Sequence, residues 1–185
     1  DEGQARTVLP GTEPNRGARQ HLVDRMIQTD LTVDVDAVGN IAGTWTPDGC
    51  DPDAPSVAVG SHLDSVPYGG IFDGPLGVYA GLEAVRALQS ADTTVTRPVT
   101  VVSFTGEEGT RFADGVLGSS VAAGQLDVDV ALNRSDGTET LKEALAEIGF
   151  QGEGRLDATA GYQAEHRSAD GRDRSASERV DVCVV

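Results

Sequence analysis

Basic residues are scarce in this 185-residue chain, and Lys142 is its only lysine. Thirty aspartates and glutamates outnumber fourteen lysines and arginines, which gives a formal net charge of −16. A surface of this charge repels nucleic acids and anionic membranes, so we expect neither as a partner. The acidic residues are spread along the chain and not gathered in one tail, which indicates a solvated acidic shell. Such a shell suits a salt-rich cytoplasm, where molar salt screens charges within about 3 Å. An ordinary acidic protein is the alternative.

Cysteine and long apolar runs are also rare. Cys50 and Cys183 form neither a C-x-x-C pair nor a disulfide framework, which favours a reducing compartment and a cytoplasmic protein. No apolar run reaches the length of a membrane span, and residues 1–10 lack the basic region and apolar core of a signal peptide. With 38% apolar residues, the chain has enough of them for the core of one globular domain.

The apolar residues follow helix and strand patterns. Three segments have helical spacing: 15–30, 74–90 and 138–150. Thr138 or Thr140 is expected to cap the last of them. Alternation of apolar and polar residues around Gly39 and Asn40 predicts a hairpin. Two unbroken β-branched runs are typical of strands buried on both faces: 56–61 and 98–104. This order of strands and helices predicts an α/β fold, with a sheet layered between helices.

Side chains suited to chemistry follow the two predicted buried strands. His62 and Asp64 come directly after the first strand, and Glu107 and Glu108 come shortly after the second. Ligands of open α/β sheets gather beyond the carboxyl ends of the strands, so we expect these side chains to meet. The alternatives are a structural, half-buried histidine and a pair of solvent-facing glutamates.

Asp73 stands immediately before the helix predicted at 74–90. Backbone N–H groups can hold a carboxylate rigidly at such a position, although capping the helix is the commoner role there. Imidazole and carboxylate together are ligands that Zn²⁺, Mn²⁺ and Co²⁺ accept, and a bridging carboxylate brings two ions within about 3.5–4 Å. The sequence therefore predicts a divalent metal site with a spare glutamate as a base.

The stretch GSHLDSVPYGGIFDGPLGVYAGLEAVRAL at 60–88, followed by EEGTRF at 107–112, resembles the metal-dependent amidases of the hydantoinase/carbamoylase family. That family includes N-carbamoyl-L-amino acid hydrolases and allantoate amidohydrolases. The resemblance runs from Arg19 to His166. It implies an α/β/α layered sheet at 1–166, the first part of a catalytic domain, and hydrolysis of a linear amide C–N bond in a small molecule.

The resemblance also implies a metal-ligand set for two divalent ions, Zn²⁺, Mn²⁺ or Co²⁺. His62 would bind one ion, Asp73 would bridge both, and Glu108 would bind the second. The segment GYQAEH at 161–166 has the tyrosine-to-histidine spacing of a family segment, so His166 is implied as the next ligand.

Two further residues receive catalytic roles from the resemblance. Glu107 would be the general base that takes a proton from the attacking water, and Asp64 would orient His62.

The sequence departs from the family pattern after His166. An irregular tail is expected at 167–185, although VDVCVV at 180–185 again resembles the family, as a local reading-frame disturbance would leave it. The family's inserted dimerisation domain and its last metal-binding histidine are not found, so a homodimer is expected only for a full-length form. Two alternatives follow: a catalytically inactive truncated remnant, or an aminoacylase or dipeptidase of the wider superfamily, which would cleave N-acyl but not N-carbamoyl substrates.

Overall fold

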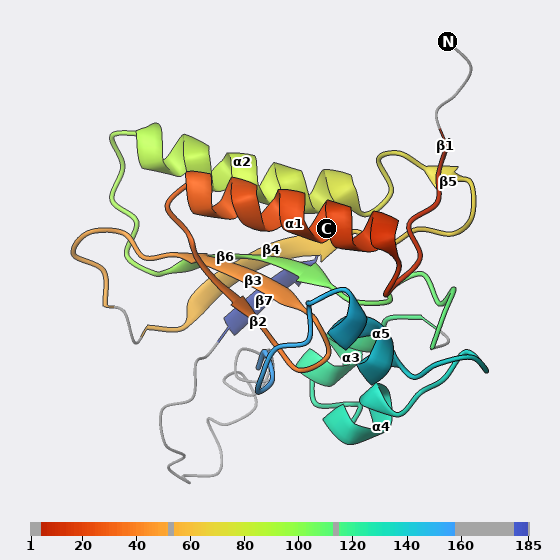
Figure 1. Ribbon diagram of the computed structural model, residues 1–185. Coiled ribbons are helices and arrows are strands. Elements are labelled where there is room, and N and C mark those ends of the chain that lie inside the picture. Colours follow the sequence, from red (N-terminus) through yellow and green to blue (C-terminus); the bar gives the residue numbers. More distant parts are fainter. Residues whose placement is uncertain (1–4, 52–53, 113–114, 158–179, 185) are drawn as a thin grey trace, which may run out of the picture.

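The computed structural model describes residues 5–51, 54–112, 115–157 and 180–184 of the chain. Figure 1 shows the elements in order: β1 (Ala5–Arg6), α1 (Glu13–Gln28), β2 (Thr32–Val35), β3 (Ile41–Trp45), β4 (Ser56–His62), β5 (Gly69–Gly70), α2 (Pro75–Ser90), β6 (Val99–Phe104), α3 (Leu117–Ala122), α4 (Val128–Leu132), α5 (Leu141–Glu147) and β7 (Val180–Val184). Among these described elements, no helix has both the length and the apolar character needed to span a membrane.

A five-stranded mixed sheet with the order β2-β3-β6-β4-β7 forms the centre of the fold. The predicted hairpin is β2–β3, whose antiparallel register pairs Val35 with Ile41. β3 runs antiparallel to β6, whereas β4 runs parallel to β6, with His62 opposite Phe104. β7 pairs in parallel with the other side of β4, so part of the predicted tail at 167–185 is a strand. Because β4 and β6 are parallel, their carboxyl ends meet at one edge of the sheet.

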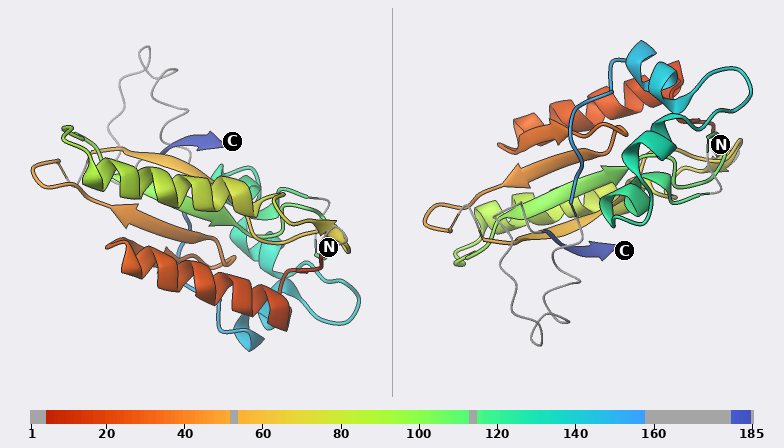
Figure 2. Two further views of the ribbon diagram at one scale, coloured as in Figure 1. Left: turned by 90° about the horizontal axis from the view of Figure 1, so that it is seen from above. Right: turned by 90° about the horizontal axis from the view of Figure 1, so that it is seen from below.

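Helices lie on both sides of this sheet, as the α/β prediction requires. α1 and α2 lie side by side across one face, and α3, α4 and α5 gather near one end, as both views of Figure 2 show. Burial of Leu22, Met26, Val78 and Val85 holds the two long helices on the sheet. Each such side chain contributes about 1.5–3 kcal/mol when it leaves water. This layered arrangement confirms the predicted fold class.

The three predicted helices and the strands at 56–61 and 98–104 are also confirmed. Thr140, not Thr138, caps α5: its side chain accepts a hydrogen bond from the Glu143 amide, and the Glu143 carboxylate accepts one from the Thr140 amide. The sequence did not predict α4 or the two-residue strands, which pair as a separate small sheet. With five residues, α4 has too few turns for a helical pattern to show.

Candidate metal centre

The carboxyl edge of the sheet brings together the side chains that follow β4 and β6. His62 is the last residue of β4, and Glu107 and Glu108 lie three and four residues beyond the end of β6. The Asp64 carboxylate joins the two segments, because it accepts hydrogen bonds from the amides of Glu107 at 3.4 Å and Glu108 at 3.2 Å. His62, Asp64, Glu107 and Glu108 therefore lie close together, as the sequence analysis expects.

The imidazole of His62 is buried, with 5% of the residue exposed. Its Nδ1 lies 3.0 Å from the main-chain oxygen of Asp64 and 3.8 Å from the Asp64 carboxylate. Its Nε2 lies 3.4 Å from Glu107 Oε2 and 4.0 Å from Asp73 Oδ1. When Nδ1 donates to the Asp64 carbonyl, the lone pair of Nε2 points toward the carboxylates, which is the arrangement of a histidine metal ligand.

Asp73 does not cap α2. The N-cap is Gly74, and within the described part of the chain no side chain caps this helix. The Asp73 side chain is 67% exposed and lies on the Nε2 side of His62. The capping alternative for Asp73 is therefore wrong, and its carboxylate is available to a ligand.

Gly74 lets the chain pass directly against the imidazole. It has φ +81°, and a Cβ placed on it would lie 2.5 Å from His62 Cε1 and 2.6 Å from Nδ1. A Cβ essentially never lies so close to a non-bonded atom, so glycine is needed both for the left-handed backbone and for the contact. The last glycine of the segment GGIFDG at 69–74 thus has a physical reason.

Glu108 supplies the clearest sign of a missing partner. Its Oε1 is buried, and no described residue forms a hydrogen bond with it. Burial raises the pKa of Glu108, and the nearby Asp73 carboxylate raises it further. An uncompensated buried carboxylate oxygen is costly, and a cation would relieve that cost.

The donor set fits a divalent cation. One ligand atom each from His62, Asp73 and Glu108 lies within 4.8 Å of the others. Donors bound at about 2.0–2.2 Å from one ion lie within about 4.4 Å of one another, so small side-chain movements would suffice. Glu107, with 39% of its side chain exposed, lies beside this group, whereas His166 lies outside the described residues.

A buried hydrogen-bond network, which the sequence analysis did not predict, holds the segment that follows β6. The Asn40 side chain donates to Asp36 at 2.9 Å and to the Gly118 carbonyl at 3.0 Å, and it accepts from the Thr105 amide at 3.0 Å. Arg19 donates to Thr105 Oγ1 at 2.9 Å. Burial lowers the pKa of Arg19 to about 10. Thr105 follows β6 directly, so the network fixes the start of the segment that carries both glutamates.

The chain is similar to known proteins over most of its length. The model of peptidase family M28 matches residues 40–167. An N-carbamoyl-L-amino acid amidohydrolase of Geobacillus stearothermophilus is 42% identical over 144 residues, which are 78% of this chain and 35% of that protein. A ureidoglycolate hydrolase of Arabidopsis thaliana is 41% identical over 121 residues, 65% of this chain and 25% of that protein.

Solved structures give the same relationship. The crystal structure of a hydantoinase/carbamoylase family amidase from Burkholderia ambifaria has 44% sequence identity and a TM-score of 0.76, with 84% of this chain and 37% of that chain covered. The chain thus spans between about a quarter and somewhat more than a third of the length of these relatives.

Proposed function

Because the chain belongs to peptidase family M28, we propose that it is part of a metal-dependent hydrolase that cleaves a linear amide C–N bond in a small molecule. The resemblance to hydantoinase/carbamoylase amidases at 60–88 and 107–112 is confirmed by the relatives. Those relatives favour an N-carbamoyl-L-amino acid, or an allantoate-like or ureidoglycolate-like compound, as the substrate.

The orphaned Oε1 of Glu108 beside His62 and Asp73 carries this proposal. His62 would hold one divalent cation, Zn²⁺, Mn²⁺ or Co²⁺, Glu108 would hold a second, and Asp73 would serve both, with His166 as a further ligand. When bound, such ions supply Lewis acidity to the substrate carbonyl and lower the pKa of water in the site.

Glu107 would act as the general base. Its carboxylate lies at the cluster, with Oε2 3.4 Å from His62 Nε2, and it is partly exposed to solvent. A group in this position can accept a proton from the attacking water and deliver it to the departing nitrogen. For an N-carbamoyl substrate the products would be an amino acid, ammonia and carbon dioxide.

Asp64 would position both halves of the site. Its main-chain oxygen lies against His62 Nδ1, and its carboxylate accepts from the amides of Glu107 and Glu108. Asp64 would thus orient His62 through the backbone, while its side chain fixes the two glutamates.

Two other functions remain candidates for this chain. An inactive remnant is favoured by the residues that follow His166, which depart from the family pattern. An aminoacylase or dipeptidase is favoured by the match to a peptidase family.

Product analysis separates these three functions. The chain loaded with Zn²⁺, Mn²⁺ or Co²⁺ would be given an N-carbamoyl, an N-acetyl and a dipeptide form of one amino acid, and an allantoate-like ureide. We expect the chain to release ammonia from the carbamoyl or ureide compounds. We expect Glu107→Gln to lose this release while it retains metal binding. Cleavage of only the acetyl or dipeptide compound would favour the peptidase alternative. No cleavage by a metal-loaded chain would favour the remnant.

The proposal also covers the compartment, the partners and the domain organisation of the protein. A net charge of −16 supports a cytoplasmic protein adapted to high salt, which acts on a small molecule and not on nucleic acid. A homodimer is proposed only for a full-length form. In domain terms, we propose that 1–166 form part of the catalytic domain and that 167–185 depart from the family pattern.

A further inference from the structure

The N-terminal segment binds along the loop that joins β4 to α2. β1 pairs antiparallel with β5, with Arg6 opposite Gly69. Two residues further on, the Val8 amide donates to Ser65 Oγ at 2.9 Å, and the Ser65 amide donates to the Val8 carbonyl at 2.9 Å. Figure 1 shows β1 and β5 side by side at the end of the molecule that carries the candidate metal centre.

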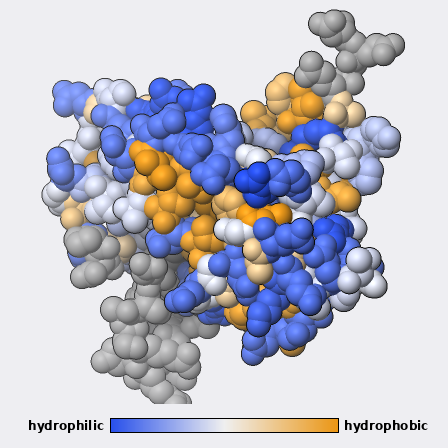
Figure 3. Space-filling model, viewed as in Figure 1, coloured by the Kyte–Doolittle hydropathy of each residue, from blue (hydrophilic) through white to orange (hydrophobic). Residues whose placement is uncertain are grey.

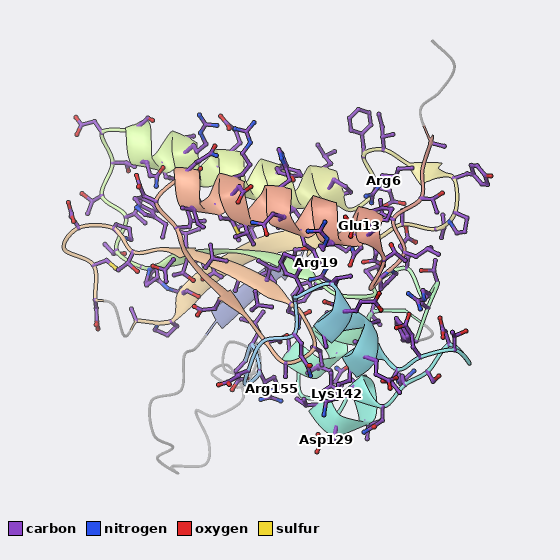
Figure 4. All side chains as sticks on the ribbon, viewed as in Figure 1. Arg6, Glu13, Arg19, Asp129, Lys142 and Arg155 are labelled. Carbon is purple, nitrogen blue, oxygen red and sulfur yellow. The ribbon has the colours of Figure 1, made fainter. Side chains whose placement is uncertain are left out.

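The guanidinium of Arg6 donates to four main-chain carbonyls of this loop. Nη1 donates to Leu63 at 2.7 Å, and Nη2 donates to Asp64 at 2.7 Å and to Asp73 at 2.8 Å. Nε donates to Gly70 at 3.2 Å. Figure 4 labels Arg6 at this position, between β1 and the loop that leads to α2. One side chain thus connects both ends of the loop.

One of these carbonyls contacts a candidate ligand, and another belongs to one. The Asp64 oxygen that accepts from Arg6 is the same atom that lies 3.0 Å from His62 Nδ1. The Asp73 carbonyl belongs to the residue whose carboxylate faces His62 Nε2. The planar guanidinium has five N–H donors in a fixed fork, enough for these four carbonyls, whereas an ammonium group has only three.

Hydrogen bonds hold this loop more than apolar packing does. Apart from Leu63, which is buried in the core, the loop exposes its large apolar side chains to solvent, visible at the upper right of Figure 3. The exposed ones are Val66, Tyr68, Ile71 and Phe72. Few buried apolar contacts mean that hydrogen bonds have to determine the loop's conformation.

We infer that Arg6 is a positioning residue that sets the geometry of His62 and Asp73 for a divalent cation without touching the cation. The inference rests on the proposed metal site. Partners that orient metal ligands typically change metal affinity by 10–100-fold when they are removed. Arg6 would act in this way through main-chain oxygens, at a distance from the ion.

Titration of the full 185-residue chain with Co²⁺, followed by visible absorption, tests the inference. Arg6→Gln is expected to weaken Co²⁺ binding by about 10–100-fold and to change the absorption band, because the ligands no longer converge. Arg6→Lys is expected to retain part of the affinity. Arg16→Gln is the matched control: Arg16 is an exposed arginine that pairs with Glu13, and its loss should leave Co²⁺ binding unchanged.

Amide hydrogen exchange in the metal-free protein provides a second, independent readout. In Arg6→Gln, exchange at 63–73 should become faster, while exchange in α2 and the thermal midpoint should stay close to those of the wild type. Faster exchange in both regions with a lower midpoint would mean a merely structural role and would overturn the inference. Co²⁺ affinity equal to that of the wild type would also overturn it. If the wild type itself failed to bind Co²⁺, the proposed metal site would be refuted, and the exchange at 63–73 would still test Arg6 separately.

Discussion

Gly74→Ala should disturb the metal centre much more than it disturbs the backbone. Gly74 has φ +81°, and Gly149, at the end of α5, has φ +73° with no atom within 4 Å of the point that a Cβ would occupy. Alanine in the left-handed region costs about 1 kcal/mol at either position. At Gly74 the new methyl group also meets the His62 ring at 2.5 Å, and forcing atoms into a packed site costs about 1–3 kcal/mol more.

We therefore expect Gly74→Ala to lower the free energy of unfolding by about 2–4 kcal/mol and Gly149→Ala by about 1 kcal/mol, as measured by urea denaturation. Calorimetric titration with Zn²⁺ should show at least about tenfold weaker binding in Gly74→Ala, because the imidazole is displaced, and unchanged binding in Gly149→Ala. If the two variants agreed in both measurements, the contact between Gly74 and His62 would have no role in the site.

Three other expectations follow. Asn40→Ala removes the side-chain hydrogen bonds to Asp36, Thr105 and Gly118 and leaves the Thr105 amide without its acceptor, so urea denaturation should show a loss of about 3–5 kcal/mol. Asn133→Ala, at an exposed residue that follows α4, should cost less than about 0.5 kcal/mol, and similar losses in the two variants would contradict the network. Hydrogen bonds from the Thr138 amide and the Arg111 guanidinium lower the pKa of Asp136 from 3.8 to about 2. This carboxylate therefore stabilises the fold above about pH 4 and loses that effect as the pH falls toward 2. Between pH 4 and pH 2 the thermal midpoint of Asp136→Asn should therefore fall less steeply than that of the wild type. An equal fall in the two proteins would refute the assignment. If the acidic shell is adapted to salt, the thermal midpoint should rise steadily as KCl increases from about 0.1 M to about 2 M; a flat response would favour an ordinary acidic protein.

Local patterns predicted the long elements well. α1 and α2 have 16 residues each, enough turns for an apolar stripe to repeat, and β4 and β6 are unbroken β-branched runs. The order of the strands could not be predicted in the same way. Placing β3 antiparallel to β6 depends on which faces are buried in the folded chain, and a single strand's sequence does not carry that information.

The residues of the candidate site also differ in how well the sequence predicts their positions. His62 and the two glutamates could be placed because each follows a recognisable strand, and Asp73 because it precedes a recognisable helix. Arg6 could not be placed. It lies in a two-residue strand without a pattern, and its partners are main-chain oxygens 57 to 67 residues away. A main-chain oxygen is present at every residue, so no side-chain motif marks those positions.

X-ray absorption at the zinc edge of the Zn²⁺-loaded chain tests the metal centre most directly. The account predicts nitrogen and oxygen neighbours at about 2.0–2.2 Å with an imidazole contribution, and a loss of that contribution in His62→Ala. Sulfur at about 2.3 Å, or a spectrum that His62→Ala leaves unchanged, would place the ion elsewhere and contradict the central claim.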